Sequence, residues 1–280
     1  MPNVSAQIIV LKKTKLSEMD LIVTGFSSEG QQVRTVVKGG RKPGSRRGAH
    51  LELFSKSQVL LYIGRSSLST VSEAELVNSH SECRRDIEHT TAAAAITELV
   101  ETISRDADVE PRLYLLLDAC LDAIGSTDTD ELDLITAASL LKIVGQVGFL
   151  PNMESCSICG RPRSSGLSMR FSFSEGGVVC PSCLASQLGE DKQQPDGFDQ
   201  SAAYFRIDEG VSPESNYTAV EPELFDWLVL LIRSRFDDLA SYAVAQNRAI
   251  GRVMLVFARD WMRAHVAPRN RSVDFLLNIR

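Results

Sequence analysis

The chain has 280 residues, of which 44% are hydrophobic and 24% are charged, and its formal net charge at pH 7 is −6. Its length is sufficient for two or three domains, and its composition is that of an ordinary globular protein, which excludes a fibrous or a wholly disordered chain. The apolar runs are far shorter than a membrane span, and the N-terminus lacks the charged-then-apolar pattern of an export signal. We therefore expect a cytoplasmic protein that does not cross a membrane.

The charge is unevenly distributed along the chain. The first 80 residues hold 11 Lys and Arg against 6 Asp and Glu, whereas the remaining 200 hold 19 against 30. A basic N-terminal part followed by an acidic body indicates a localised anion-binding surface. The net charge of the whole chain is therefore a poor guide to its partners.

Residues 4–77 have the pattern of short strands separated by turn residues. Val, Ile, Leu and Thr are frequent, and apolar and polar residues partly alternate. The expected strands cover residues 4–11, 20–27, 31–37, 52–63 and 67–75. Five strands in about 75 residues are typical of a small barrel of the oligonucleotide-binding (OB) type. An SH3-like barrel fits the pattern almost as well.

A basic stretch separates the third expected strand from the fourth. Residues 37–48 carry five cations and no acid. Glycines and a proline disfavour a helix here, so we expect an adaptable loop that can follow a phosphate backbone. A basic loop that only aids solubility is the alternative. The candidate DNA contacts are the loop cations and one nearby arginine: Arg34, Lys38, Arg41, Lys42, Arg46 and Arg47.

Beyond Arg84 the apolar residues recur with a helical period. This period predicts helices over about 87–103, 111–124 and 131–147. Pro111 suits the first turn of its helix, because a proline has no backbone N–H to leave unpaired there.

Four of the six cysteines form two CxxC pairs, separated by twenty residues: Cys156 and Cys159, then Cys180 and Cys183. A hairpin turning at Gly176-Gly177 would bring the pairs together around one soft ion, most often zinc. Four cysteine ligands leave no open position on the metal, so such an ion would be structural. Two disulfides or four ordinary buried thiols are the alternatives.

The rest of the chain has the pattern of an exposed connection over 189–199, followed by helices over 222–239 and 245–265. Four arginines of the last helix fall in one narrow sector: Arg248, Arg252, Arg259 and Arg263. A solvated helix face is one interpretation of this arginine stripe. A second DNA site, or a site for an acidic peptide, is the other.

With these residues in view, the chain resembles the RecO family of bacterial recombination mediators. The likeness rests on the basic loop with Leu51–Phe54, on Gly148–Gly160 and on Gly176–Cys183, in that order. It implies an α+β multidomain protein with an N-terminal OB-fold β-barrel, an α-helical domain and an inserted zinc module with four cysteine ligands. The segments are an OB-fold at 1–80, a helical domain at 81–150 continued at 201–280, and the zinc module at 151–200.

The resemblance also implies a function. Proteins of this family are understood to bind single- and double-stranded DNA, to anneal complementary strands, and to work with RecR in helping RecA replace single-strand-binding protein at gaps. By matching position, the basic loop inherits DNA contact and the four cysteines inherit one zinc ion. We therefore expect a nucleoid-associated DNA-repair mediator without catalytic residues. Its arginine stripe would face an acidic partner, such as the tail of single-strand-binding protein.

Two other functions compete with this interpretation. A zinc-containing, sequence-specific transcription regulator would read bases through the cysteine module. That module has few basic residues, Arg161, Arg163 and Arg170, and no clear recognition helix. A zinc hydrolase would need an open metal position and a nearby general base, and the cysteine count argues against both.

Overall fold

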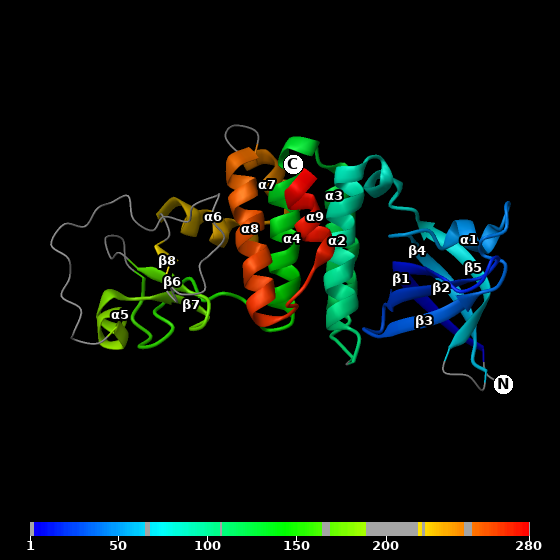
Figure 1. Ribbon diagram of the computed structural model, residues 1–280, viewed down its shortest axis with the longest axis horizontal. Coiled ribbons are helices and arrows are strands. Elements are labelled where there is room, and N and C mark those ends of the chain that lie inside the picture. The colour runs from blue at the N-terminus through cyan, green and yellow to red at the C-terminus, as the bar shows by residue number, and fades with distance from the viewer. Residues whose placement is uncertain are drawn as a thin grey trace. The chain divides into compact units, whose positions relative to one another are not determined.

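The structure is a computed structural model (Figure 1) that describes residues 3–64, 68–106, 108–163, 169–188, 218–219, 222–243 and 248–279. The chain divides into two compact units. The larger consists of residues 1–148 and 235–280, and the smaller consists of residues 149–234. No helix among the described residues is both long enough and apolar enough to cross a bilayer.

The N-terminal part of the larger unit is a closed five-stranded barrel (Figure 1). Its strands are β1 (Asn3–Lys15), β2 (Leu21–Ser27), β3 (Gln32–Val37), β4 (Lys56–Tyr62) and β5 (Ser69–Asn78). The hydrogen-bonded order is β1-β2-β3-β5-β4, with β4 closing back on β1. Neighbouring strands are antiparallel except for β3 and β5, which are parallel. The OB-type barrel is thereby confirmed over the SH3-like alternative.

Alternating apolar side chains fill the barrel. Ile8 and Val10 of β1 and Val23 of β2 are fully buried in it together with Val59 and Val71. Burial of one such side chain contributes roughly 1.5–3 kcal/mol, and the spacing of two residues places successive apolar side chains on the same face of a strand. The alternation that predicted the strands therefore also builds their core.

A short helix, α1 (Arg46–His50), lies between β3 and β4, where the sequence predicted a loop without a helix. The prediction was wrong for these residues because Ser45 caps the helix, its side-chain oxygen accepting a hydrogen bond from the backbone N–H of Gly48. Gly48 also lets the helix approach the preceding turn closely, since a Cβ there would lie 2.1 Å from the carbonyl oxygen of Gly40. The basic segment is therefore folded, and two of its arginines are held on a helix.

Helices form the rest of the larger unit. They are α2 (Ile87–Ile103), α3 (Arg112–Ser126), α4 (Leu132–Gln146), α7 (Phe236–Ala243), α8 (Arg248–His265) and α9 (Arg271–Ile279), with short 3-10 turns η1 (Ser81–Arg84) and η2 (Thr129–Glu131). The first three confirm the helices expected from the periodicity. Helix α4 is buried without interruption from Leu132 to Leu141, and packs against α2 and α8 (Figure 1). It is the central element of the helical core.

The expectation of one helix over 222–239 was wrong. Two helices occupy this stretch, α6 (Pro222–Arg233) and α7, with Ser234 and Arg235 between them. Helix α7 begins anew with Asp237 and Asp238 in its first turn, where the helix dipole favours negative charge. The break coincides with the boundary between the two units.

Helix α9 was not predicted from the sequence. Asn270 caps it by accepting a hydrogen bond from the backbone N–H of Val273 at 3.0 Å, and Val273, Leu276 and Leu277 are its buried side chains. The capping residue and the spacing of these apolar residues were the available signals. For α8, positions 245–247 of the expected helix lie outside the described residues.

Among its described residues, the smaller unit contains a small antiparallel sheet and two helices. Its strands β6 (Arg170–Ser172), β7 (Gly177–Val179) and β8 (Thr218–Ala219) are ordered β7-β6-β8, and its helices are α5 (Pro181–Leu188) and α6. The expected hairpin turn at Gly176 and Gly177 is confirmed. Gly177 is required because a Cβ would lie 2.2 Å from the carbonyl oxygen of Asn152. The expected connection over 189–199 lies outside the described residues.

Candidate anion-binding and metal sites

A cavity of about 610 Å³ lies on the barrel beside the end of β3 and the start of α1. Four cations, Lys38, Lys42, Arg46 and Arg47, line this basic cavity. The cavity also contains Asp20, whose carboxylate accepts a hydrogen bond from the backbone N–H of Gly39 at 2.8 Å. Several like charges around one hollow raise the positive potential inside it and attract anions.

These four cations lie together without an acidic partner, whereas Lys12, Lys13 and Lys56 of the barrel are neutralised by carboxylates. Lys12 pairs with Glu101 at 3.0 Å, and Lys13 pairs with Glu52 at 2.7 Å. Within the described part of the chain, no ion pair involves any of the four cavity cations, although the guanidinium of Arg47 donates a hydrogen bond to the carbonyl oxygen of Val71 at 3.3 Å. The cavity therefore gathers four cations that are not neutralised by an acid, and an incoming phosphate would meet them together.

The two other predicted DNA contacts lie outside the basic cavity. The guanidinium of Arg41 donates hydrogen bonds to the carbonyl oxygens of Ser17 at 3.1 Å and Glu18 at 2.8 Å. Arg34 is exposed on β3 and lines a separate cavity of about 570 Å³, together with Arg105 and two aspartates. The structure thus brings four of the six predicted residues together.

The two CxxC pairs converge in the smaller unit. In the first pair, the backbone N–H of Gly160 closes the turn by donating to the carbonyl oxygen of Cys156 at 2.9 Å, and Gly160 adopts the left-handed conformation with φ of 72°. In the second pair, Cys180 directly follows β7, and Cys183 lies in the first turn of α5. The turn and the helix start direct all four thiols toward one point.

The spacing of the sulfur atoms fits a tetrahedral metal ion. The four Sγ atoms lie within 4.8 Å of one another, and those of Cys159 and Cys180 are 3.7 Å apart. In a tetrahedral zinc site with Zn–S bonds of about 2.3 Å, sulfur atoms are separated by about 3.8 Å. A disulfide would bring two sulfurs to about 2.05 Å, and all four cysteines are unbridged. The cluster therefore matches a closed, four-coordinate site for a soft ion rather than two disulfides.

The thiols of the cluster do not share negative charge evenly. The backbone N–H of Cys183 lowers the pKa of the Cys180 thiol to about 6. Burial opposes ionisation of Cys156, but hydrogen bonds from backbone N–H groups, that of Cys159 foremost, lower its pKa. The pKa of Cys183 rises to about 12 because its thiol hydrogen-bonds to Cys159. Neighbouring thiolates repel one another, so a bound cation is what would allow all four to ionise.

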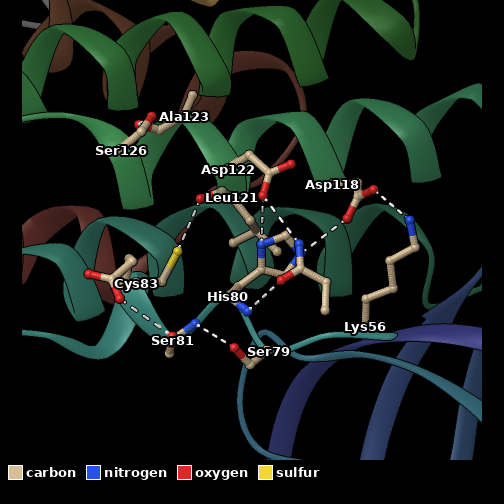
Figure 2. Close-up of polar contacts among 12 residues, drawn as sticks. Lys56, Ser79, His80, Ser81, Cys83, Asp118, Leu121, Asp122, Ala123 and Ser126 are labelled. Carbon is tan, nitrogen blue, oxygen red and sulfur yellow. Dashed lines mark hydrogen bonds and ion pairs between the residues drawn. The ribbon is translucent and has the colours of Figure 1, made fainter. Parts of the chain in front are cut away.

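A second cluster holds the barrel against the helices of the larger unit (Figure 2). His80 follows β5, and its side chain is 1% exposed. Its Nε2 lies 3.1 Å from Oδ1 of Asp118 and its Nδ1 lies 3.1 Å from Oδ1 of Asp122, both on α3. Lys56 of β4 lies 2.7 Å from the other oxygen of Asp118. Sequence reasoning missed this cluster.

The charged groups of this second cluster pair with one another. Burial opposes ionisation of Asp118, but hydrogen bonds from His80 and Lys56 outweigh it and lower the pKa of the carboxyl. His80, Asp118 and Asp122 are close enough to share a cation. Lys56 already pairs with the carboxylate of Asp118, and both ring nitrogens of His80 face carboxylates. We therefore interpret the cluster as a junction between the barrel and the helices.

The arginine stripe of α8 is engaged within the larger unit. Arg252 donates to the carbonyl oxygen of Leu277, Arg259 lies 2.7 Å from Asp260, and Arg263 lies 2.5 Å from Asp274. The side chain of the fourth member, Arg248, lies outside the described residues. Unlike the cations of the basic cavity, Arg259 and Arg263 of the described stripe are neutralised by acidic partners.

An OB barrel with an unpaired basic cavity, helices packed on it and a cluster of four cysteines together define a nucleic-acid-handling protein of the OB-fold class. The family model described as "Recombination protein O N terminal" matches residues 1–80, and "Recombination protein O C terminal" matches residues 84–207. The chain belongs to the RecO family of DNA repair proteins, as the sequence resemblance predicted, and has a role in DNA repair and recombination.

Individual relatives agree with this assignment. The DNA repair protein RecO of Desulforamulus reducens is 32% identical over 180 residues, which cover 64% of this chain and 68% of that protein. The RecO protein of Cutibacterium acnes is 33% identical over 188 residues, covering 65% of this chain and 75% of that protein. The RecO protein of Acetivibrio thermocellus is 24% identical over 270 residues, covering 96% of this chain and 94% of that protein.

Proposed function

We propose that the protein is a non-catalytic DNA-binding mediator that holds phosphates in the basic cavity. The observation that carries the proposal is the group of four cations without an acidic partner, Lys38, Lys42, Arg46 and Arg47, around one hollow of an OB barrel. Each phosphate that they neutralise releases condensed counterions, so affinity falls as salt rises and does not depend on base sequence. Single and double strands both carry phosphates, and both are expected to bind.

The same arrangement supports annealing of complementary strands. Cations between two backbones reduce the repulsion between their phosphates. Base pairing then proceeds without any bond being made or broken by the protein, so the mechanism needs no catalytic group.

Family membership suggests the setting of this activity. We place the protein with RecR in helping RecA replace single-strand-binding protein at gaps. An acidic tail of single-strand-binding protein reaching the arginine stripe would have to exchange with Asp260 and Asp274, which already pair with Arg259 and Arg263. We therefore assign the primary DNA site to the basic cavity and the acidic partner to the stripe.

We also propose that the four clustered cysteines hold one zinc ion. A metal with four sulfur ligands has no position for water or substrate, so its role would be to stabilise the smaller unit. In zinc-finger peptides such a site supplies roughly 10–16 kcal/mol of apparent binding energy, which is also folding energy.

The DNA site is tested by a salt titration of single-stranded DNA binding, followed by fluorescence anisotropy. Four phosphate contacts at about 0.7 released counterions each predict a log–log slope of about −2.8, or about a fiftyfold loss of affinity between about 50 and 200 mM salt. The double substitution Lys42→Ala with Arg46→Ala should weaken binding and bring the slope to about −1.4. The matched control, Arg112→Ala with Arg269→Ala, removes two exposed cations elsewhere. An unchanged slope in the cavity variant would refute this site.

A further inference from the structure

Two apolar side chains are exposed beside the basic cavity. Leu16 is 49% exposed and Met19 is 46% exposed. Both belong to the hairpin tip, residues 16–20, which joins β1 to β2, and Met19 itself lines the basic cavity. Single exposed apolar residues are common on protein surfaces. This pair is unusual because it adjoins a group of unpaired cations.

The hairpin tip has a fixed internal structure. The backbone N–H groups of Leu16 and Ser17 donate to the carbonyl oxygen of Asp20 at 3.1 and 3.3 Å. The hydroxyl oxygen of Ser17 accepts hydrogen bonds from the backbone N–H groups of Met19 at 3.3 Å and Asp20 at 3.1 Å. The apolar side chains therefore project from a hydrogen-bonded turn.

The hairpin tip is also tied to the turn that carries the cations. The backbone N–H of Arg41 donates to the carbonyl oxygen of Met19 at 2.9 Å, and its guanidinium donates to those of Ser17 and Glu18. The carboxylate of Asp20 accepts from the backbone N–H of Gly39 at 2.8 Å. These bonds make the apolar pair and the cations parts of one surface, with Arg41 as the residue that joins them.

We propose that Leu16 and Met19 contact the bases of the strand whose phosphates occupy the basic cavity, and that this surface prefers unpaired to paired DNA. The inference rests on the proposed function. In an intact duplex the base faces are stacked and closed to a side chain, whereas in a single strand each base has a free apolar face. Other DNA-binding proteins insert aliphatic side chains between bases next to phosphate contacts.

Charge on the hairpin tip orients the strand. Glu18 is exposed on the same tip, and its carboxylate repels phosphates, whereas the carboxylate of Asp20, which lines the cavity, accepts a hydrogen bond from the backbone N–H of Gly39. The backbone is therefore directed toward the four cations, and the bases are directed toward Leu16 and Met19. In this arrangement Arg41 is a positioning residue that holds the tip in place without touching DNA.

The experiment compares two oligonucleotides of equal length and charge, one of thymidines and one of abasic tetrahydrofuran residues. The full-length protein should bind the thymidine strand about tenfold more tightly, because burying the exposed parts of two apolar side chains is favourable. The double substitution Leu16→Ser with Met19→Ser should remove this difference. It should leave the affinity for the abasic strand and the salt slope unchanged. The control Leu115→Ser changes a leucine that is 66% exposed on α3, and should preserve the difference.

Arg41→Ala separates positioning from phosphate contact. As a positioning residue Arg41 supports only the preference for bases, so its loss should reduce that preference and leave the salt slope unchanged. A slope less steep by about 0.7 would instead make Arg41 a phosphate contact and contradict this role. Unfolding temperatures are measured for every variant. If the double variant is destabilised, Met19→Gln, which keeps the side-chain length, serves as the second variant in which the preference for thymidine should be reduced.

The outcomes distinguish the inference from the proposed function. Equal affinity of the unaltered protein for the two oligonucleotides would overturn base contact and leave backbone binding intact. If the preference for thymidine persists in both the double variant and Met19→Gln, residues outside the hairpin tip must contact the bases. Absence of binding to either strand at low salt would overturn the proposed function itself.

Discussion

The thiol of Cys156 is buried in the cluster of four cysteines, and its sulfur accepts a hydrogen bond from the backbone N–H of Cys180 at 3.4 Å. We expect Cys156→Ser to release zinc and to lower the unfolding temperature of the smaller unit, because oxygen is a poor substitute for a thiolate on this metal. Metal content per chain and a thermal melt measure the two effects. Cys120→Ala removes a buried thiol of the larger unit and should leave the metal content unchanged. Full zinc content in Cys156→Ser would contradict the assignment.

The junction cluster gives a prediction with a defined pH dependence. We expect Asp118→Asn to destabilise the larger unit by about 1–3 kcal/mol at pH 6, because its charged hydrogen bonds with Lys56 and His80 are weakened. The pKa of Asp118 is lowered on folding. Its contribution is therefore fully present above the unfolded pKa of about 4 and is lost as the pH falls through the lower folded value.

Urea unfolding at pH 6 and at about pH 3 tests this dependence. The difference in unfolding free energy between the unaltered protein and Asp118→Asn should shrink at the lower pH. Asp106→Asn, at an exposed carboxylate, serves as the control. A difference that stays constant with pH would show that the ionised form of Asp118 adds nothing to the junction.

At the level of single residues, the sequence revealed sites whose members are close in the chain. The cysteine cluster was predictable because each CxxC turn is local. The hydrogen bonds of Arg41 were not predictable, because they go to the backbone carbonyls of Ser17 and Glu18 on another hairpin, and backbone carbonyls have no sequence signature. His80 was missed for the same reason, since only folding brings it to Asp118.

Among the elements, α1 has the most direct bearing on the proposed DNA site, because it carries Arg46 and Arg47. We expect Ser45→Ala to cost about 1 kcal/mol through loss of the helix cap. It should also weaken DNA binding a few-fold by releasing the two arginines from their places at the cavity. Chemical denaturation and anisotropy measure these effects, and Ser72→Ala on the exposed face of β5 is the matched control. DNA affinity that is unchanged despite the lost cap would mean that α1 does not position the arginines.

The elements also show where periodicity is a sufficient guide. The barrel strands and α2 to α4 were found because each repeats its apolar spacing over many residues. Helix α1 has five residues, too few to show a period, and the break at Ser234 and Arg235 contains neither glycine nor proline. Helix α1 depends on its capping residue, and the break coincides with the boundary of a compact unit. Neither produces a repeated apolar spacing in the sequence.

For the whole molecule, the chain order places the smaller unit as an insertion, because residues on both sides of 149–234 belong to the larger unit. The basic cavity is lined entirely by residues of the larger unit, and the four clustered cysteines lie entirely within the insertion. Metal binding and DNA binding at the cavity are therefore expected to be separable properties of one chain.

Removal of zinc by a chelator tests this separation. We expect the smaller unit to unfold into a loop of 86 residues between two fixed ends. The length-dependent part of the entropy cost of closing such a loop is about 4 kcal/mol, which lowers the stability of the larger unit. Calorimetry should show the transition of the smaller unit disappear and that of the larger unit move to lower temperature. DNA affinity at 25 °C should stay within about twofold while the larger unit remains folded. If DNA affinity instead falls in proportion to the zinc removed, the insertion must itself contact DNA, and the site extends beyond the barrel.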